Sequence, residues 1–389
     1  MPEGKATVPI SRRVVVGEHA GPGSALVEAG PLLFTSSFDG NRATLAAPID
    51  PALAGAVEAQ CENSYAAIAQ LLAQAGLGMD SIVRLDHFTE SQDWLPRRQS
   101  VRGRLFGKPA PLASTGVAAR MAGTNLLSTA AIAVQPAEAK RVVVSGPDFG
   151  MANISSAVAA GPFVFVSGVR GRADPHWYEA GPDSPDASHD QTCICYQQIK
   201  EILRRGGLGA DRILRIDGFL RDAAHEAAEA AARRAVLGSD ANAVTIVSLP
   251  LGGRGEVEIT AMALAQGDKS VFVMPDEDAP AGVGGGGFVF VGACAAGKAD
   301  SAAAADAQRD IGLALDRLAA RLAACESGLS QIVRLDVYLR DLSWLDELGR
   351  VIRAYFPKDP PAVAIAGADP AGAAMVGIGA IAVRHNVPV

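Results

Sequence analysis

The sequence predicts an α+β protein in which one small fold is written three times in tandem. Three pentapeptides are nearly identical: RLDHF begins at Arg84, RIDGF at Arg215 and RLDVY at Arg334. Two apolar segments, an early strand and a closing strand, repeat in step with these pentapeptides. Self-similarity at a fixed period marks a repeated structural unit. The three copies are therefore expected to fold alike and to pack around a pseudo-threefold axis.

The spacing of these markers sets the repeat boundaries. Early strands are expected at 30–37, 161–168 and 286–293, and closing strands at 127–134, 257–264 and 376–383. All markers move by about 120 to 130 residues from copy to copy, which is a normal length for a domain. We place the repeats at 1–137, 138–268 and 269–389.

Each repeat is predicted to run strand, variable loop, helix, strand, helix, strand. The first helix of copy one has apolar residues at the three-to-four spacing of one buried face, at Val57, Cys61, Tyr65, Ile68 and Leu72. Left-handed glycines are expected to end this helix in the three copies, at Gly76, Gly207 and Gly328. The glycine run at 282–287 is expected to be a flexible bend before a strand, because no Lys-Ser/Thr follows it.

The middle strand of each repeat carries an Arg-x-Asp pair. Residues two apart in a strand project to the same face. Around a pseudo-threefold axis, six charges can then alternate in a ring of ion pairs, from Arg84, Asp86, Arg215, Asp217, Arg334 and Asp336. The ring either sets the register between repeats, which is the commoner role of such pairs, or forms part of a pocket wall.

Composition excludes several classes of protein. With 49% hydrophobic and 20% charged residues the chain can form packed cores, and its net charge of −7 argues against a nucleic-acid or acidic-membrane surface. The N-terminus lacks the apolar core of a signal peptide, so a cytoplasmic protein is expected. The five cysteines are not paired at metal-ligand spacing. No metal and no cofactor are expected.

The order of these motifs resembles the Rid (YjgF/UK114) family. The matching pieces are Ser167-Gly168, 82–89, 332–342, Leu249-Pro250 and 257–264. The resemblance implies three Rid-like (chorismate-mutase-like) domains. Family members are usually homotrimers with a central β-barrel, outer helices and a cleft at each subunit boundary. Three fused copies imply an intramolecular pseudo-trimer, which we expect to be a monomer with three non-equivalent clefts.

The family's best-known reaction is hydrolysis of 2-imino or enamino acids, which depends on an arginine that grips the substrate carboxylate. That arginine is missing here, and we place Leu112, about Ala241, and Val363 at its position. The family's acidic residue on the closing strand is replaced by Ser128 and Gly377 in copies one and three. Copy two keeps it as Glu258, or as Glu256 if the alignment is shifted.

The resemblance suggests site residues mainly in copies one and two. Candidate catalytic residues are Glu258, Ser114 and Thr115. Candidate substrate-binding residues are Ser37, Gln99, Arg120, Ser167, Gly168 and Arg170. Arg120 and Arg254 are possible substitutes for the lost arginine, and copy three is read as scaffold.

Two further segments have open interpretations. The insertion 174–189 is either a lid or a solvated loop, and it carries His176, Trp177, Tyr178 and His189. The second helix of copy one is basic at Arg97, Arg98, Arg102 and Arg104. Arg98 and Arg102 share a face, so they either meet an anionic substrate or form part of a charged outer surface, which is the commoner arrangement.

The functional hypothesis is a divergent Rid-superfamily enzyme that acts on a small molecule at an inter-repeat cleft, as a hydrolase, deaminase or lyase of a specialised pathway. One alternative is a non-catalytic small-molecule-binding or regulatory pseudo-trimer. Another is a chorismatase-like lyase, for which the resemblance implies a carboxylate near the C-terminal closing strand. The ending GIGAIAVRHNVPV has none.

Overall fold

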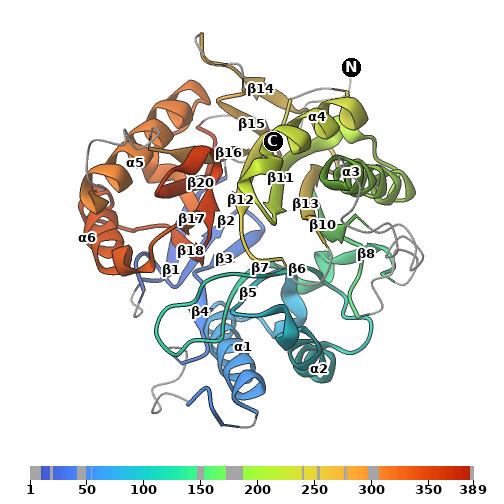
Figure 1. Ribbon diagram of the computed structural model, residues 1–389, viewed down its shortest axis with the longest axis vertical. Helices are drawn as coiled ribbons and strands as arrows, with labels where there is room; N and C mark the ends of the chain where they lie inside the picture. Colours follow the sequence, from blue (N-terminus) through green and yellow to red (C-terminus); the bar gives the residue numbers. More distant parts are fainter. Residues whose placement is uncertain are drawn as a thin grey trace.

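The computed structural model describes residues 10–17, 21–41, 50–53, 55–146, 153–171, 187–238, 241–251, 255–275, 277, 279–296 and 306–385. Three sheets surround a common centre and the helices lie on the periphery (Figure 1). Two helices cover each sheet, so the chain consists of three α+β units, as the repeated markers predict.

The elements recur in the same order in the three repeats. Repeat 1 contains β1 (Arg12–Val16), β2 (Leu26–Ala29), β3 (Leu32–Thr35), β4 (Phe38–Asp39), α1 (Ala56–Gln74), β5 (Ile82–Thr89), α2 (Leu95–Phe106), β6 (Ala113–Ala118) and β7 (Leu127–Val134). Repeat 2 contains β8 (Arg141–Val144), β9 (Ala157–Ala160), β10 (Phe163–Arg170), α3 (Ala187–Arg205), β11 (Ile213–Leu220), α4 (Glu226–Leu237), β12 (Ala243–Ser248) and β13 (Val257–Leu264). Repeat 3 contains β14 (Ser270–Phe272), β15 (Gly282–Gly285), β16 (Phe288–Ala295), α5 (Ala307–Ala324), β17 (Ile332–Leu339), α6 (Leu345–Tyr355), β18 (Ala362–Gly367), β19 (Asp369–Pro370) and β20 (Val376–Val383).

The closing strand lies at the middle of every sheet. Strands β7, β13 and β20 pair antiparallel with the early strand on one side and with the Arg-x-Asp strand on the other. The Arg-x-Asp strand then pairs in parallel with β6, β12 or β18. The second helix of the repeat supplies the crossover that parallel pairing requires. These three parallel strands were not predicted, because their sequences are short and weakly alternating.

Apolar residues of all three sheets meet in one shared core. The inner faces contribute Phe34, Phe163, Phe165, Phe288 and Phe290, each at most 1% exposed. Each repeat also has its own apolar cluster between its sheet and its helices. Burial of aromatic side chains from all three repeats in one place couples their stabilities. The central core therefore makes the three repeats a single packed unit.

Side chains bridge the backbones where two repeats meet. Between repeats 1 and 2, the Ser114 amide donates to Ser167 Oγ at 2.9 Å. Between repeats 3 and 1, the Val363 amide donates to Ser36 Oγ at 2.8 Å. Between repeats 2 and 3, the bond runs from the Ala293 amide to Thr245 Oγ1 at 3.1 Å. We call these places junction 1–2, junction 3–1 and junction 2–3.

Two glycine predictions are corrected by the backbone. Gly76 and Gly207 have the expected left-handed φ, but in repeat 3 that position is held by Glu326 with φ 58°, whereas Gly328 is extended. The glycine run before β16 is a strand, β15, and not only a bend. A Cβ on Gly282 would lie 2.7 Å from Cys325 Sγ, so glycine permits close packing of this strand.

Candidate functional site

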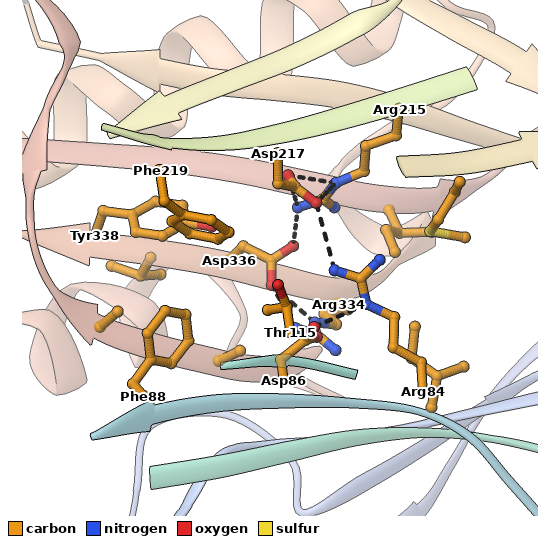
Figure 2. A pocket seen from close by; sticks show the side chains of 16 residues that line it. Arg84, Asp86, Phe88, Thr115, Arg215, Asp217, Phe219, Arg334, Asp336 and Tyr338 are labelled. Carbon is orange, nitrogen blue, oxygen red and sulfur yellow. Dashed lines mark hydrogen bonds and ion pairs between the residues drawn. The ribbon is translucent and has the colours of Figure 1, made fainter. Parts of the chain in front are cut away.

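The six Arg-x-Asp charges form a closed ring at the centre of the molecule (Figure 2). Each arginine contacts the aspartate two residues along its own strand at 2.7 to 2.8 Å. It also contacts the aspartate of a neighbouring repeat, at 2.7 Å for Arg215 to Asp336 and for Arg334 to Asp86, and at 3.7 Å for Arg84 to Asp217. The ring of alternating ion pairs predicted from the sequence is present.

The ring is a structural feature and leaves little space for a ligand. The cavity at its centre has a volume of about 20 Å³, enough for about one water. Phe88, Phe219 and Tyr338 form an aromatic layer on one side (Figure 2). Burial alone would raise the pKa of Asp86, but the charges of Arg84 and Arg334 outweigh it and hold that pKa at about 2.

Junction 1–2 gathers most of the polar residues singled out from the sequence. Glu258 on β13 accepts from Thr115 Oγ1 at 3.1 Å and from the Gly116 amide at 3.4 Å, both on β6. Arg170 Nε on β10 donates to the other carboxylate oxygen of Glu258 at 2.7 Å. Gly168 leaves the space for this contact, because a Cβ there would lie 2.4 Å from Glu258 Oε1. One carboxylate of repeat 2 is thus held against the edge of repeat 1.

The arginines of α2 divide into an outer pair and an inner pair. Arg97 forms an exposed ion pair with Glu58 at 2.8 Å, and Arg104 pairs with Glu62. Arg98 and Arg102 are instead only 3% and 2% exposed. The expectation of a solvated outer face is therefore right for the first pair and wrong for the second. Residues four apart on a helix share a face, and this face packs on β6.

Arg98 and Arg102 have few hydrogen-bond partners in their buried position. Arg102 Nη1 donates to Ser114 Oγ at 3.2 Å, while Arg102 Nε and the Nε and Nη1 atoms of Arg98 are buried without a partner. No carboxylate of the described residues forms an ion pair with either arginine. Burial first and the neighbouring Arg102 second lower the pKa of Arg98 to about 10. Both guanidinium groups remain charged at neutral pH.

A glycine makes room for the inner pair. A Cβ on Gly116 would lie 2.0 Å from Arg98 Nη2, so the guanidinium rests directly on the β6 backbone. The equivalent fourth residues of β12 and β18 are Ile246 and Ile365. A β-branched side chain at this position would exclude an arginine. Repeat 1 alone among the three combines the glycine with the arginines.

His87 lies in the same buried layer. Its Nε2 is 2.8 Å from the Tyr65 hydroxyl and its Nδ1 is 3.3 Å from Ser114 Oγ. Burial first, and then the charges of Arg98 and Arg102, lower the pKa of His87 well below its usual range. The imidazole is therefore neutral, and it connects Tyr65 through Ser114 to Arg102.

The equivalent positions in the other repeats are electrically balanced or apolar. The fourth and eighth residues of α4 are Glu229 and Arg233, which form an ion pair at 3.1 Å, and Glu229 also accepts from the Tyr196 hydroxyl. In α6 the same positions hold Leu348 and Ile352, both fully buried. Only repeat 1 buries two cations at these positions. An alignment of the three repeats places Arg98 and Arg102 at the positions of the buried Leu348 and Ile352 of α6. That alignment is the sequence signal that could have identified the two arginines as buried.

The remaining predicted residues lie in other places. Gln99 accepts from Asn153 Nδ2 at 3.1 Å at the edge of junction 1–2. Ser37 and Arg120 lie at junction 3–1, where Ser37 Oγ accepts from the Ile365 amide and Arg120 pairs with Asp369. Arg254, His176, Trp177 and Tyr178 are outside the described residues, whereas His189 lies in α3 beside Asp190.

Strand register settles two alignment questions. Glu258 pairs opposite Phe219 just as Ser128 pairs opposite Phe88 and Gly377 opposite Tyr338, so Glu258 is the residue of copy two at this position. Glu256 instead approaches Arg221 and His225. The register also shows that Val363 matches Ser114 and not Leu112. None of the strands β6, β12 and β18 contains an arginine.

Comparisons with known proteins identify the fold. The sequence matches no family model and no curated protein. Among solved structures, chorismatase is 18% identical and has a TM-score of 0.53, over 78% of this chain and 93% of the chorismatase chain. A YjgF/YER057c/UK114 family member from Mycobacterium tuberculosis is 23% identical with a TM-score of 0.27, over 32% of this chain and 98% of its own. A Rid-family protein of unknown function from Yersinia pestis is 18% identical with a TM-score of 0.29, over 32% and 99%.

The matched structures cover different shares of the chain. The Rid-family structures each span about a third of the chain, whereas chorismatase spans most of it. Within the described residues, no helix has both the length and the hydropathy needed to cross a bilayer. The chain therefore shares the fold of chorismatase, and its three repeats each contribute one sheet and its helices to that fold.

Proposed function

We propose that this protein is a divergent Rid-superfamily enzyme that acts on a small carboxylate-bearing molecule at junction 1–2. The observation that carries the proposal is the buried pair Arg98 and Arg102, which faces β6 and forms no ion pair with a described residue, although the charge of Glu258 acts on Arg98 from a longer distance. Leaving a buried charge uncompensated costs several kcal/mol. An anionic substrate compensates that charge, which supports a binding role for the pair.

The inner pair replaces the missing strand-borne arginine in function. A guanidinium group can bind a carboxylate through several N–H donors, and the Nε and Nη1 atoms of Arg98 are donors without a partner. In this assignment the cation reaches the junction from helix α2 and not from strand β6. The Ser114 hydroxyl, 3.2 Å from Arg102 Nη1 and 3.3 Å from His87 Nδ1, fixes the position of the second guanidinium.

Glu258 is assigned the proton-transfer role. Its carboxylate borders Thr115, Gly116 and Gly168, and the two glycines let the Arg98 guanidinium and the Glu258 carboxylate lie directly against the backbone of β6 and β10. A carboxylate held in this way can orient a water molecule or accept a proton in hydrolysis, deamination or elimination. Arg170 holds the second oxygen of Glu258 and leaves Oε1 directed at Thr115. Thr115 then orients the reacting water together with Glu258.

A chorismatase-like lyase is the second candidate. Two adjacent buried guanidinium groups suit a dianion, and chorismate, the compound after which chorismatase is named, carries two carboxylates. The closing strand of repeat 3 has Gly377 where Glu258 stands in repeat 2. Any such reaction would therefore use the carboxylate of junction 1–2.

The experiment measures binding and turnover by the full chain. Pyruvate, maleate and chorismate are titrated by calorimetry, and ammonia release is followed with freshly generated 2-iminobutyrate. We expect carboxylate binding to be at least about tenfold weaker in Arg98→Met and Arg102→Met, and unchanged in the control Arg97→Ala on the exposed face of α2.

Glu258→Gln separates an enzyme from a binding module. In an enzyme this variant retains carboxylate binding but loses turnover, because the amide cannot accept a proton. Binding without turnover of any probe by the wild-type protein would favour the non-catalytic alternative. Carboxylate binding that is equal in wild type, Arg98→Met and Arg102→Met would refute the site itself.

A further inference from the structure

A second and larger cavity lies at junction 3–1, away from Glu258. Its volume is about 390 Å³, within the range of small-molecule pockets. Helix α1 and strand β4 of repeat 1 form one wall, and α6 with β18 of repeat 3 forms the other. Repeat 3, which the sequence suggests is scaffold, therefore contributes half of a cavity.

The inner part of the cavity presents oxygen atoms. Ser128 is 2% exposed and its hydroxyl has no hydrogen-bond partner. Asp39 is paired with Ser128 across β4 and β7, and its carboxylate accepts from Asn125 Nδ2 at 3.1 Å. A buried hydroxyl without a partner is uncommon and costs free energy unless a bound molecule satisfies it. Together Ser128 and Asp39 present acceptors for an amino or hydroxyl group.

The outer part of the cavity presents guanidinium groups. Arg120 is held by Asp369 at 2.8 Å through Nη2, while its Nε is buried without a partner. Arg353 lies on the solvent-exposed side of α6, over Gly349, and forms no ion pair with a described residue. Asp346 of α6 also lines the cavity, so the lining combines two cations with the carboxylates of Asp39 and Asp346.

Apolar side chains also line the cavity. They are Phe38, Leu71, Leu345 and Ile365. A ligand that satisfies the cationic, anionic and apolar parts of the lining therefore needs a carboxylate, a hydrogen-bond donor and a short hydrocarbon part. The three junctions differ in the pair of residues that the early and closing strands place at this position. The Asp39–Ser128 pair corresponds to Arg170–Glu258 at junction 1–2 and to Ala295–Gly377 at junction 2–3.

We propose that junction 3–1 is a second binding site, which takes a small amino acid or hydroxy acid with an apolar side chain. The carboxylate binds Arg353 and the Nε of Arg120. The amino or hydroxyl group donates to Asp39 and Ser128. At the closing-strand position the site has Asp39 and Ser128 where junction 1–2 has the ion pair of Arg170 and Glu258, so the two junctions select different molecules.

The test titrates the full chain with L-leucine, L-phenylalanine and 3-phenyllactate. Two truncated probes, 4-methylpentanoate without the donor and isoamylamine without the carboxylate, measure each polar end. We expect at least one complete probe to bind about tenfold or more tightly than either truncated probe. Arg353→Gln should weaken that binding about tenfold and Ser128→Val about fivefold.

Two controls keep the result specific to this cavity. Arg350→Gln removes an exposed arginine of α6 that pairs with Glu347 and does not line the cavity, so binding should be unchanged. Arg102→Met should also leave it unchanged, which separates this site from junction 1–2. Absence of binding by all complete probes, or equal affinity in wild type, Arg353→Gln and Ser128→Val, would overturn the proposal.

Discussion

Arg334 of the third repeat donates to Asp86 of the first repeat at 2.7 Å, although 248 residues separate them in the sequence. Both side chains are about 5% exposed. This contact closes the ring that begins with Arg84 and passes through repeat 2. Because every arginine bridges an aspartate of its own strand and one of a neighbour, the ring fixes how the repeats face one another.

The first prediction concerns this ring. Asp86→Asn should lower the free energy of unfolding by about 3 to 5 kcal/mol, because it leaves Arg84 and Arg334 buried with reduced compensation. Urea unfolding at pH 7 measures the change. Since Arg84 and Arg334 hold the pKa of Asp86 at about 2, its stabilisation is complete above pH 4 and is lost as the pH falls toward 2. The exposed Glu62→Gln is the control and should leave the midpoint unchanged.

The second prediction concerns assembly. The ring and the shared aromatic core already satisfy within one chain the contacts that three separate subunits would supply. Size exclusion with light scattering should therefore give the mass of one chain, 39.9 kDa. A stable assembly of three chains would show that the core is completed between molecules.

The sequence predicts features that depend on local pattern and repetition. The closing strands have the bounds expected from their apolar runs, and Arg84 and Asp86 face the same side because strand geometry requires it. The resemblance to the Rid family singled out Thr115 and Glu258, which are in hydrogen-bond contact, and Ser114, whose hydroxyl instead contacts Arg102 and His87. Because each strand pattern occurs three times, the sequence identifies these strands more firmly than one copy would.

The sequence does not predict features that depend on contacts between elements. Arg98 and Arg102 look like surface residues because arginine is rarely buried. Their burial depends on Gly116, which lies on another strand and has no side chain to exclude them. His87 is a similar case, since only the parallel pairing of β5 and β6 brings it to Ser114.

The third prediction follows from the unbalanced charge at junction 1–2. Arg98→Met should raise the free energy of unfolding of the ligand-free protein by about 1 to 3 kcal/mol, because it removes a buried cation without a partner. The same variant should lose carboxylate binding. Arg98→Glu reproduces the Glu229–Arg233 pair of repeat 2 and should also stabilise the protein while abolishing binding. A destabilised Arg98→Met protein in urea unfolding would mean that the arginine has a structural role.

The fourth prediction concerns the buried Glu229–Arg233 ion pair, which occupies the equivalent positions in repeat 2. Glu229 is 1% exposed and accepts from both Tyr196 and Arg233. Glu229→Gln removes the charge of the carboxylate that pairs with Arg233 and should destabilise the protein by about 2 to 4 kcal/mol. Binding of carboxylates at junction 1–2 should be unchanged, as calorimetry of the folded variant would show. Loss of binding together with stability would indicate that the two repeats are coupled through their helices.

The fifth prediction concerns pH and His87. Burial and two adjacent arginines lower the pKa of His87 in the folded state well below 6.5, the value expected for the unfolded chain. Its contribution to stability is therefore complete above pH 6.5 and is lost as the pH falls below it, because only the unfolded chain takes up the proton. Between pH 6 and 5 this one group should lower the free energy of unfolding by up to about 1.4 kcal/mol per pH unit. His87→Gln should be less stable at pH 8 but should show a shallower loss from pH 6.5 to 5. Parallel slopes for the two proteins in urea unfolding would mean that the imidazole is protonated in the folded state, and the assignment of a neutral His87 would then fail.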